Sequence, residues 1–389
     1  VVASLSTAKA STRYGGRFLH ISQILAAEDG SVVIQTDTPY EDLTVLLDIP
    51  IIKHTEQAVD RPLGSGPYKI APTVTGIQLV KDPNWWSKKD MAVDAETITL
   101  LEATSNTQIR DEFQFGDLGL VYADPGSDRY ADYRCDYELW DCENGIFVYV
   151  GCNMTSPIFS NESVRAALTH AIDRDMLAET YYRGFARGAT LPASPLSPVY
   201  NANLAGRYGY DLEKFSAAVT AAGFQGQTVT LLVNSDDSLR VRVARAIADS
   251  LRASGLQVTM SELSGKAYTD ALYLRYYDLY VGQTRLSPNM DLSEFFRPWG
   301  NLSWGSVDNE NLYNLCKEAL DNHGNYYNLH KALADDGRII PLLFCGYAVY
   351  ADRGLVSELE PARDNVFFYT LGRTNDDALI PIDYHNSEG

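Results

Sequence analysis

Apolar residues recur at helical spacing in the segment that follows Asn153. They stand three and four positions apart, at Val164, Ala167, Leu168, Ala171 and Ile172. This spacing places one apolar stripe along the side of a helix. Ser160 or Asn161 precedes the stripe where an N-cap residue belongs, because its side-chain oxygen can accept an otherwise unpaired backbone N–H. The pattern predicts an amphipathic helix, and packing against a core explains it without any further role.

Strand and helix signals alternate along most of the remaining chain. Runs rich in β-branched and apolar residues predict strands at 31–37, 96–103, 145–153, 228–234, 256–263 and 338–352. Helical periodicity predicts helices at 105–115, 212–224, 239–255 and 309–320, and a short helix through Leu43, Leu46 and Leu47. The order strand, long helix, glycine, strand over 228–263 is typical of a crossover between parallel strands. The chain is therefore predicted to be an α/β protein.

The composition is typical of a globular protein. Of 389 residues, 45% are hydrophobic and 21% are charged, which is enough chain for two or three domains with substantial cores. No apolar run approaches the roughly 20 residues that a membrane-spanning helix needs. The formal charge of -19 comes from 51 acidic and 32 basic residues. A surface this negative repels phosphate backbones, so no nucleic acid is expected to bind this part of the chain.

Three short segments occur in an order and at spacings that are typical of one family. Segment 63–70 is a glycine-rich turn that leads into a strand, 153–177 contains the predicted helix, and 277–291 contains a further strand. The matching residues are Gly64, Gly66, Pro67, Tyr68, Lys69, Asn153, Pro157, Phe159, Val164, Arg165, Ala167, Leu168, Ala171, Ile172, Asp173, Arg174, Asp278 and Leu279. On these residues the chain resembles the family 5 extracellular solute-binding proteins, the oligopeptide- and dipeptide-binding relatives that serve ABC importers. The part from Asn153 to Arg174 is the most specific.

The resemblance implies a two-lobed periplasmic-binding-protein-like fold of type II, cluster C, with an extra subdomain. Its mixed sheets would be flanked by helices, and a ligand cleft would lie between the lobes. The implied parts are 1–66 as a subdomain of lobe I whose N-terminal part is missing, 67–190 as the core of lobe I, 191–342 as lobe II, and 343–389 as the return to lobe I. The chain would cross between lobes near residues 190 and 343. The proline-rich segment 191–200, which has no periodicity, fits the first crossing.

The function implied by the resemblance is the capture of a small solute, peptide-like or anionic, by two hinged lobes that close around it. The expected partners are that solute and an ABC transporter permease, with the protein itself a monomer. The expected location is extracellular or periplasmic, on a lipid anchor at the cell membrane. The first residues, VVASLSTAKAS, are typical of a helix interior, so we expect an upstream segment, with its anchor or signal, to be missing.

A second class of function remains open from the sequence. The same fold occurs as the ligand-sensing domain of transcription regulators, in which the missing upstream part would be a helix-turn-helix. A lipobox cysteine at an intact N-terminus would favour the transporter subunit, and a basic helical segment would favour the regulator. A structural or adhesive surface protein without ligand affinity is a third interpretation.

The expected solute contacts lie in the segment after Leu279, residues 280–289. The resemblance implies that a peptide backbone is held here as an added strand. In peptide binders an aspartate in this segment captures the ammonium group of the peptide, and the matching position in this chain is Ser287. Charge-assisted hydrogen bonds are about twice as strong as neutral ones, so a serine hydroxyl does not replace that carboxylate. Ordinary peptide binding is therefore disfavoured.

Gln283, Thr284 and Arg285 are the polar residues that the same segment offers instead. A guanidinium can hold a carboxylate or phosphate through two parallel hydrogen bonds. We therefore expect Arg285 to contact an anionic group of the solute. The alternative is that Arg285 pairs with a nearby acid such as Asp291 and braces the loop.

Three further residues complete the predicted site. The resemblance places Asn153 at the position of a ligand-contacting asparagine at the edge of the hinge; the alternative is a turn residue that bonds its own backbone. Tyr149 and Trp140 would supply aromatic walls to the cleft. Most of the 25 tyrosines must nevertheless be core or surface residues.

The sequence nominates no catalytic, metal or cofactor chemistry, so the chain is not predicted to be an enzyme. It has no G-x-S-x-G elbow, and the glycine turn at 64–66 lacks the third glycine and following helix of a dinucleotide loop. The six histidines show no close pairing, and no C-x-x-C occurs. The five cysteines are too scattered for a disulfide framework: Cys135, Cys142, Cys152, Cys316 and Cys345. A hairpin would bring Cys135 and Cys142 within bridging distance, and the alternative is that all five stay reduced.

Overall fold

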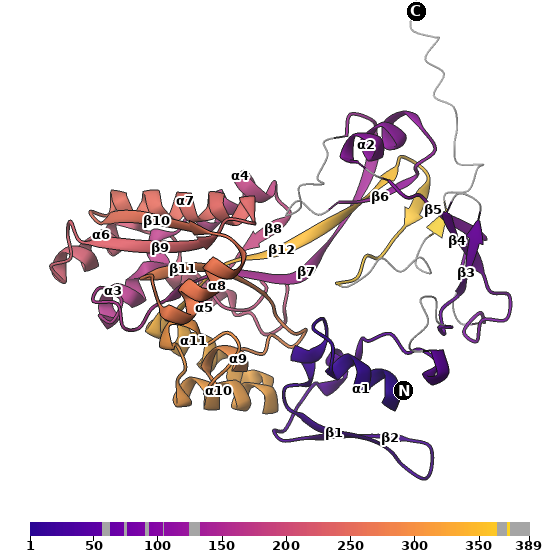
Figure 1. Ribbon diagram of the computed structural model, residues 1–389, viewed down its shortest axis with the longest axis horizontal. Coiled ribbons are helices and arrows are strands. Elements are labelled where there is room, and N and C mark those ends of the chain that lie inside the picture. Colours follow the sequence, from indigo (N-terminus) through magenta and orange to yellow (C-terminus); the bar gives the residue numbers. More distant parts are fainter. Residues whose placement is uncertain are drawn as a thin grey trace, which may run out of the picture. The chain divides into compact units, whose positions relative to one another are not determined.

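The computed structural model describes residues 1–56, 63–73, 76–89, 93–103, 105–123 and 133–363 and the backbone of 372–373. The chain divides into two compact units, each built from separated stretches of sequence (Figure 1). Unit 1 comprises Val1, Pro50–Cys142 and Tyr347–Gly389, and unit 2 comprises Val2–Ile49 and Glu143–Gly346. Strands β7 (Tyr137–Cys152) and β12 (Ile339–Asp352) run from one unit into the other. The lobe boundaries that the sequence suggests at 66, 190 and 342 differ from this division and stay a prediction.

Unit 2 contains a mixed sheet. Besides β7 and β12, its strands are β8 (Ala186–Gly188), β9 (Thr228–Asn234), β10 (Gln257–Leu263) and β11 (Leu279–Arg285). They follow the order β10-β9-β11-β7-β12, and β8 pairs with β12. β9 lies parallel to β10 and β11, whereas β11 runs antiparallel to β7. The parallel pair β9 and β10, joined by helix α7 (Ser238–Ala253), confirms the predicted crossover.

Each face of this sheet is covered by its own hydrophobic core, as alternation along the strands requires. Val148 and Val150 of β7 belong to a core that includes residues of α3, α4, α6 and α7. Phe147 and Tyr149, on the opposite face, belong to a core that includes residues of α8 to α11. The helix bounds are α3 (Glu162–Ala167), α4 (Arg174–Tyr182), α5 (Ala202–Ala205), α6 (Leu212–Ala221), α8 (Gly265–Leu274), α9 (Ser293–Phe296), α10 (Glu310–Asp321) and α11 (Tyr326–Asp336).

Two tyrosines lie over glycines on the neighbouring strand of the sheet. Tyr149 of β7 is directly opposite Gly282 of β11, and Tyr280 is opposite Gly151. A Cβ added to Gly282 would lie 2.4 Å from the Tyr149 ring, and one on Gly151 would lie 2.2 Å from the Tyr280 ring. The two rings therefore occupy the space that a side chain would need, and each glycine is required by the ring that covers it.

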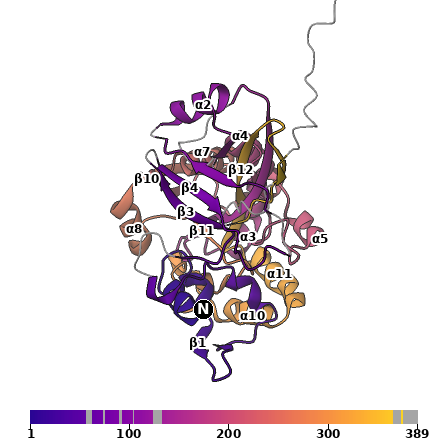
Figure 2. The same ribbon diagram turned by 90° about the vertical axis from the view of Figure 1, so that its right-hand side faces the viewer.

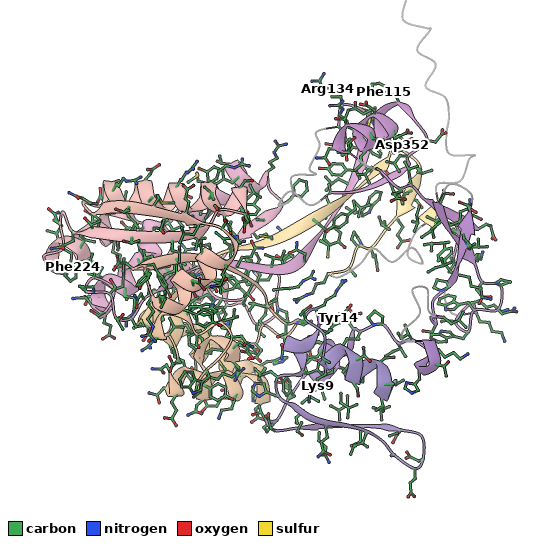
Figure 3. The ribbon with its side chains drawn as sticks, viewed as in Figure 1. Lys9, Tyr14, Phe115, Arg134, Phe224 and Asp352 are labelled. Carbon is green, nitrogen blue, oxygen red and sulfur yellow. The ribbon has the colours of Figure 1, made fainter. Side chains whose placement is uncertain are left out.

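Residues 2–49 form a small element of unit 2 with its own core of Leu5, Phe18, Ile21 and neighbours. Helix α1 (Val2–Lys9) confirms the helical character of the first residues, and strands β1 (Ile21–Ala26) and β2 (Val32–Thr36) form an antiparallel hairpin. The short helix predicted through Leu43 is a 3-10 turn, Leu43–Leu47. Figure 3 labels Lys9 and Tyr14 on this part of the chain; the Lys9 ammonium donates to the Ile21 carbonyl oxygen at 2.6 Å.

Unit 1 contains smaller sheets. Strands β3 (Tyr68–Thr73), β4 (Gly76–Lys81) and β5 (Thr97–Leu100) pair antiparallel in that order. Helix α2 (Asn106–Phe115) precedes β6 (Leu120–Ala123), which pairs antiparallel with the end of β12, and β13 (Val356–Glu358) pairs with β14 (Gly372–Arg373). Figure 2 shows β3 and β4 from a second direction. The predicted helix, Gly116 stop and strand over 105–122 are confirmed, with Gly116 as the C-cap of α2.

The helix predicted from the stripe at 164–172 is interrupted. α3 ends at Ala167 and passes into a 3-10 turn over Leu168–Ala171. Ile172 is then extended, with φ -119° and ψ 114°, and α4 begins a new helix. The reason is local, because the Asp173 side chain accepts the Met176 backbone N–H and so starts a helix where the first would have continued. The N-cap of the first helix is Asn161, one of the two residues considered.

Candidate functional site

Side chains in the segment that carries the family resemblance form hydrogen bonds to backbone groups of unit 2. The Asn161 side chain accepts the Val164 N–H at 3.1 Å, which caps α3. The Arg165 guanidinium is buried and donates from Nε to the Asp336 carbonyl oxygen at 2.7 Å and from Nη1 to the Phe159 carbonyl oxygen at 3.0 Å. These contacts hold the turn before α3 against the end of α11, so this part of the segment is structural.

Arg174, like Arg165, is buried and donates to backbone carbonyl oxygens, and it makes more hydrogen bonds. Its side chain is 5% exposed, and Nε donates to the Pro341 carbonyl oxygen at 2.8 Å. Nη1 donates to the carbonyl oxygens of Thr169 (3.0 Å) and Ile172 (3.2 Å), and Nη2 donates to the Thr169 hydroxyl at 2.9 Å. Burial lowers the pKa of Arg174 to about 10. The guanidinium therefore links the 3-10 turn to β12.

Asn153 joins the end of β7 to the approach to β11. It is 5% exposed, and its Nδ2 donates to the Tyr277 carbonyl oxygen at 2.8 Å. Its Oδ1 accepts the Thr155 N–H at 3.1 Å and the Thr155 hydroxyl at 2.8 Å. Both ends of the amide are thus used within unit 2, which supports the turn residue considered as the alternative. A solute contact by Asn153 stays a prediction.

Asp278 reinforces the same junction. Its Oδ1 accepts the Ser156 hydroxyl at 2.6 Å, and its Oδ2 accepts the Thr230 backbone N–H at 2.8 Å. The carboxylate therefore links β9 to the turn after β7, and it sets where β11 begins.

The polar residues predicted to bind a solute stand at the end of β11. The first residues of this strand, through Gly282, are buried, whereas Gln283 and Arg285 are exposed and Thr284 is half-buried between them. Their partners on β7 are Val148, Phe147 and Ile146. The polar side chains at the end of β11 are therefore exposed while the strand backbone stays paired with β7. A fixed backbone of this kind positions side chains precisely enough for recognition.

Arg285 is held by the main chain. Its Nε donates to the Asn144 carbonyl oxygen at 2.7 Å, and the backbone of the next residue, Leu286, donates to Gly145 at 3.1 Å. The acid proposed as an alternative partner, Asp291, bonds elsewhere: its Oδ1 accepts the Ser293 hydroxyl at 2.6 Å and the Ser293 N–H at 2.9 Å. Contact between Arg285 and an anionic solute stays a prediction.

Ser287 donates its hydroxyl proton to Asn289 Oδ1 at 2.7 Å, and both side chains are half-buried. The turn they form is closed by the Met290 N–H, which donates to the Ser287 carbonyl oxygen at 2.9 Å. Met290 has a left-handed backbone, with φ 57°. The loop after β11 is therefore a defined turn on which the position of Ser287 is set.

The two aromatic residues of the predicted site lie in different units. Tyr149 is 2% exposed in the core of unit 2, stacked on Phe147 and edge-on to Tyr280 and Phe295. Burial raises the pKa of its hydroxyl. Trp140 is half-buried in unit 1 and packs against the core of Tyr347 and its neighbours. Both rings have packing roles, and their part in a solute site stays a prediction.

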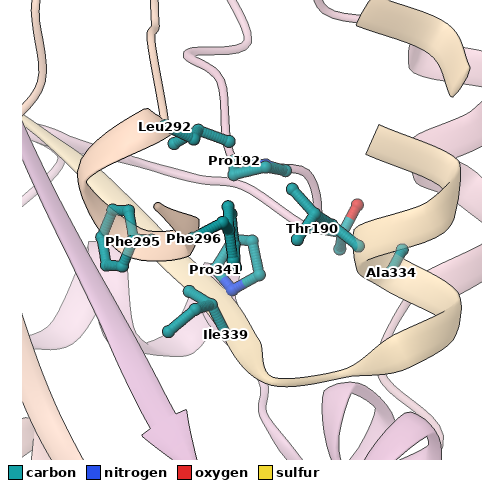
Figure 4. A pocket seen from close by; sticks show the side chains of 9 residues that line it. Thr190, Pro192, Leu292, Phe295, Phe296, Ala334, Ile339 and Pro341 are labelled. Carbon is teal, nitrogen blue, oxygen red and sulfur yellow. The ribbon is translucent and has the colours of Figure 1, made fainter. Parts of the chain in front are cut away.

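A small cavity lies inside unit 2 (Figure 4). Its volume is about 10 Å³, and apart from Thr190 it is lined by apolar side chains: Pro192, Leu292, Phe295, Phe296, Leu333, Ala334, Ile339 and Pro341. Even one water needs about 10 to 15 Å³ and polar partners. The cavity is therefore a packing defect rather than a solute site. The proline-rich segment 191–200 begins here, with Leu191 and Ala193 fully buried in unit 2.

Two buried histidines have environments that the sequence does not indicate. His20 is surrounded by Asp37, Ser293 and Asp291, and no pattern links residues so far apart in the chain. His330 on α11 is fully buried, and neither ring nitrogen has a hydrogen-bond partner among the described residues. Desolvation lowers the pKa of His330 to about 4.

No disulfide joins the five cysteines, all of which lie in the described part of the chain. The pair considered at Cys135 and Cys142 is thus not bridged in this structure. Across the described ranges, no three His, Cys, Asp or Glu side chains gather as metal ligands would. Within the same ranges, no helix combines the length and the apolar character needed to cross a bilayer.

The mixed sheet of unit 2, with helices on both faces, places the chain among α/β proteins. The model of the bacterial extracellular solute-binding proteins, family 5 Middle, matches residues 1–306. The oligopeptide-binding protein AppA of Bacillus subtilis is 23% identical over 232 residues, 55% of this chain and 42% of that protein. AppA from Clostridium difficile has a similar solved structure, with a TM-score of 0.78, 16% identity, and coverage of 95% of this chain and 83% of that one. The oligopeptide-binding protein AppA from Bacillus subtilis in complex with a nonapeptide gives a TM-score of 0.64 at 19% identity, over 96% of this chain and 83% of that one.

This chain belongs to the bacterial extracellular solute-binding proteins, family 5, because the match covers most of its length. The family resemblance and the fold class expected from the sequence, a two-lobed periplasmic-binding-protein-like fold with mixed sheets, are confirmed. The chain spans about half the length of the curated relatives it matches, between 42% and 53% for the first of them.

Proposed function

We propose that this protein is the solute-binding component of an ABC importer, which captures a small peptide-like or anionic solute and releases it unchanged to a permease. The observation that carries the proposal is the family match over residues 1–306, and a relative named as oligopeptide-binding supports it. The solute would shift a hinge equilibrium by binding one state more tightly than the other, so no bond of the solute is made or broken. The protein would act as a monomer outside the cytoplasmic membrane, held there by a lipid anchor.

The proposed contacts are Gln283, Thr284 and Arg285 at the end of β11, with Ser287 in the turn that follows. Asn153, Tyr149 and Trp140 complete the proposed site. The exposed, strand-paired position of Gln283 and Arg285 supports direct recognition, because hydrogen-bonding groups are displayed there on a fixed backbone.

Native mass spectrometry of gently purified protein tests the proposal. We expect a bound compound of defined mass, either a short peptide or an acidic small molecule. Incubation with a mixture of short peptides from digested casein should give adducts at the masses of particular peptides. Solute capture would be refuted if the purified protein carries no bound compound and takes up neither casein peptides nor acidic metabolites.

Replacing Arg285 by Gln is expected to weaken binding of casein peptides that carry a free C-terminal carboxylate. Loss of a charge-assisted hydrogen bond corresponds to a decrease in affinity of about tenfold or more. The measurement is a calorimetric titration of one bound peptide and its C-terminal amide. Arg242→Gln, on the exposed side of α7, is the control and should change neither affinity. Equal binding of acid and amide forms by the unmodified protein would contradict the role assigned to Arg285.

Replacing Ser287 by Asp is expected to increase affinity for peptides with a free N-terminal ammonium. A carboxylate at this position would make a charge-assisted hydrogen bond that the hydroxyl cannot, which corresponds to about a tenfold gain. The comparison is between a free peptide and its N-acetylated form. Ser287→Asn supplies the same shape without the charge, and it should leave the ratio of the two affinities unchanged. No gain in that ratio for Ser287→Asp would show that the ammonium does not lie near this residue.

A further inference from the structure

His20 lies at the centre of a polar cluster within unit 2, in which the Asp291 side chain is buried and the Asp37 side chain is 59% exposed. His20 is 2% exposed, and its Nδ1 is 3.1 Å from Asp37 Oδ1. Its Nε2 is 3.2 Å from the hydroxyl oxygen of Ser293 and 3.6 Å from Asp291 Oδ2. Residues 2–49 supply His20 and Asp37, whereas the loop and helix after β11 supply Asp291 and Ser293. The cluster therefore joins two parts of unit 2 that are distant in sequence.

The hydrogen bonds of the cluster have a definite direction. The Ser293 hydroxyl proton is committed to Asp291 Oδ1 at 2.6 Å, so the Ser293 oxygen is left as an acceptor for His20 Nε2. Asp37 is an acceptor for Nδ1. An imidazole with protons on both nitrogens matches this arrangement, and its charge lies beside the buried carboxylate of Asp291. Burial raises the pKa of Asp291, and hydrogen bonding from Ser293 and the charge of His20 oppose the rise.

Other titratable groups surround the pair from each neighbouring element. Tyr40 follows β2, and its ring centroid is 6.0 Å from that of His20. Electrostatic interactions with Asp291 also reach groups on α9, α10 and α11, namely Glu294, Tyr313, Cys316 and Tyr326. The cation Arg297, which follows α9, also acts on Tyr313, but its guanidinium is paired with Glu294 at 3.0 Å. His20 Nε2 lies 3.6 Å from Asp291 Oδ2 and is the counter-charge placed beside that carboxylate.

The cluster is continuous with the proposed solute contacts. Asp291 follows directly on the left-handed residue Met290, which closes the turn containing Ser287. The Tyr326 hydroxyl of α11 donates to the carbonyl oxygen of Asn289 in the same turn. The turn that ends the proposed contact segment is therefore fixed at its far end by α11 and by the cluster.

A catalytic role for this cluster is excluded by its geometry. Ser293 has no exposed surface, and its proton points to Asp291 rather than to the imidazole. A serine nucleophile requires the opposite direction of hydrogen bonding and access for a substrate.

We propose that His20 is a positioning residue for the solute: by neutralising Asp291 and bonding Ser293, it holds the turn at 287–290 in its binding geometry and so sets solute affinity. The inference rests on the proposed function in that it assumes that this turn contacts the solute. Removing the imidazole leaves a buried carboxylate without its counter-charge, which is more costly than removing both charges together.

The test is His20→Gln, with casein peptides as the probe. We expect affinity at about pH 8 to fall by roughly tenfold or more, since the uncompensated Asp291 carboxylate disrupts the turn. At a lower pH, where the raised pKa of Asp291 favours uptake of a proton, affinity should recover relative to the unmodified protein. Adding Asp291→Asn to His20→Gln removes the charge and should restore affinity at about pH 8 as well. His54→Gln, an exposed histidine of unit 1, is the control and should change nothing.

Two results would overturn the inference: affinity unchanged in His20→Gln, or affinity lost equally at both pH values and not restored by Asp291→Asn. If the unmodified protein binds no casein peptide, the peptide class of the proposed function fails, and hydrogen exchange decides the inference separately. The backbone amides of Met290 and Ser293 are bonded to Ser287 and Asp291. They should exchange faster in His20→Gln at about pH 8 and return to normal with Asp291→Asn. Exchange unchanged by His20→Gln would refute the positioning role.

Discussion

Replacing Arg174 by Met is expected to destabilise unit 2 by about 3 kcal/mol. Methionine keeps much of the volume of the side chain but has no N–H groups, so the carbonyl oxygens of Thr169, Ile172 and Pro341 lose their donor. Each buried acceptor left without a partner costs about 1 to 3 kcal/mol. Methionine carries no charge, so the variant no longer pays the desolvation cost of a buried guanidinium, and this offsets part of the lost stability. The measurement is urea unfolding followed by circular dichroism.

Two further variants make this result specific to the guanidinium. Arg174→Lys keeps the charge but presents a single nitrogen that cannot reach acceptors on both sides, so it should remain destabilised. Arg242→Met on the exposed side of α7 should lie within about 0.5 kcal/mol of the unmodified protein. A stability for Arg174→Met equal to that of Arg242→Met would show that the main-chain bonds of Arg174 do not support the fold.

Replacing His330 by Phe is expected to remove a large part of the acid sensitivity of the protein. The pKa of His330 is lowered by burial from 6.5 to about 4, so the folded protein keeps the ring neutral where the unfolded chain binds a proton. Above about pH 6.5 both states are neutral, and His330 contributes no pH dependence. Between pH 6.5 and about 4, the unfolded state gains the proton and stability falls as pH falls, by about 3 kcal/mol in total.

Phenylalanine fits the same place because it is apolar and the neighbouring ring of Tyr326 lies 5.5 Å away, centroid to centroid. Stability at neutral pH should therefore be equal to or greater than that of the unmodified protein, since no unpaired ring nitrogen remains buried. Urea midpoints measured from about pH 7 to about pH 4 give the slope. His54→Phe, at an exposed position, should keep the original slope. An unaltered slope in His330→Phe would mean that the ring is hydrated or hydrogen-bonded in solution.

Local pattern was sufficient for most of the elements in unit 2. The strand predicted at 228–234 coincides with β9, and the strand and helix around it differ from β10 and α7 by one or two residues. These elements follow from side-chain spacing within a few residues and from a glycine that ends the helix. The same rules missed the break at Ile172, because a capping side chain at Asp173 competes with the apolar stripe.

The candidate site was predictable only as far as the family resemblance extends. The resemblance placed Gln283, Thr284 and Arg285 together, and their shared strand follows from adjacency in the chain. Their exposure at the end of a strand whose first half is buried depends on the register with β7, which the sequence does not contain in readable form. The packing of Tyr149 over Gly282 depends on the same register.

From the sequence alone came the α/β class, the family, the crossover between β9 and β10, and the residues of the specific segment. The tertiary structure decided what those residues do: Arg174 and Asn153 bond their own main chain, and His20 meets Ser293, 273 positions away. The physical reason is the separation along the chain between residues that interact. Periodicity and capping act between residues a few positions apart and leave a mark in the sequence, whereas the partner of a buried polar group is set only when distant segments pack together and every hydrogen bond must be satisfied.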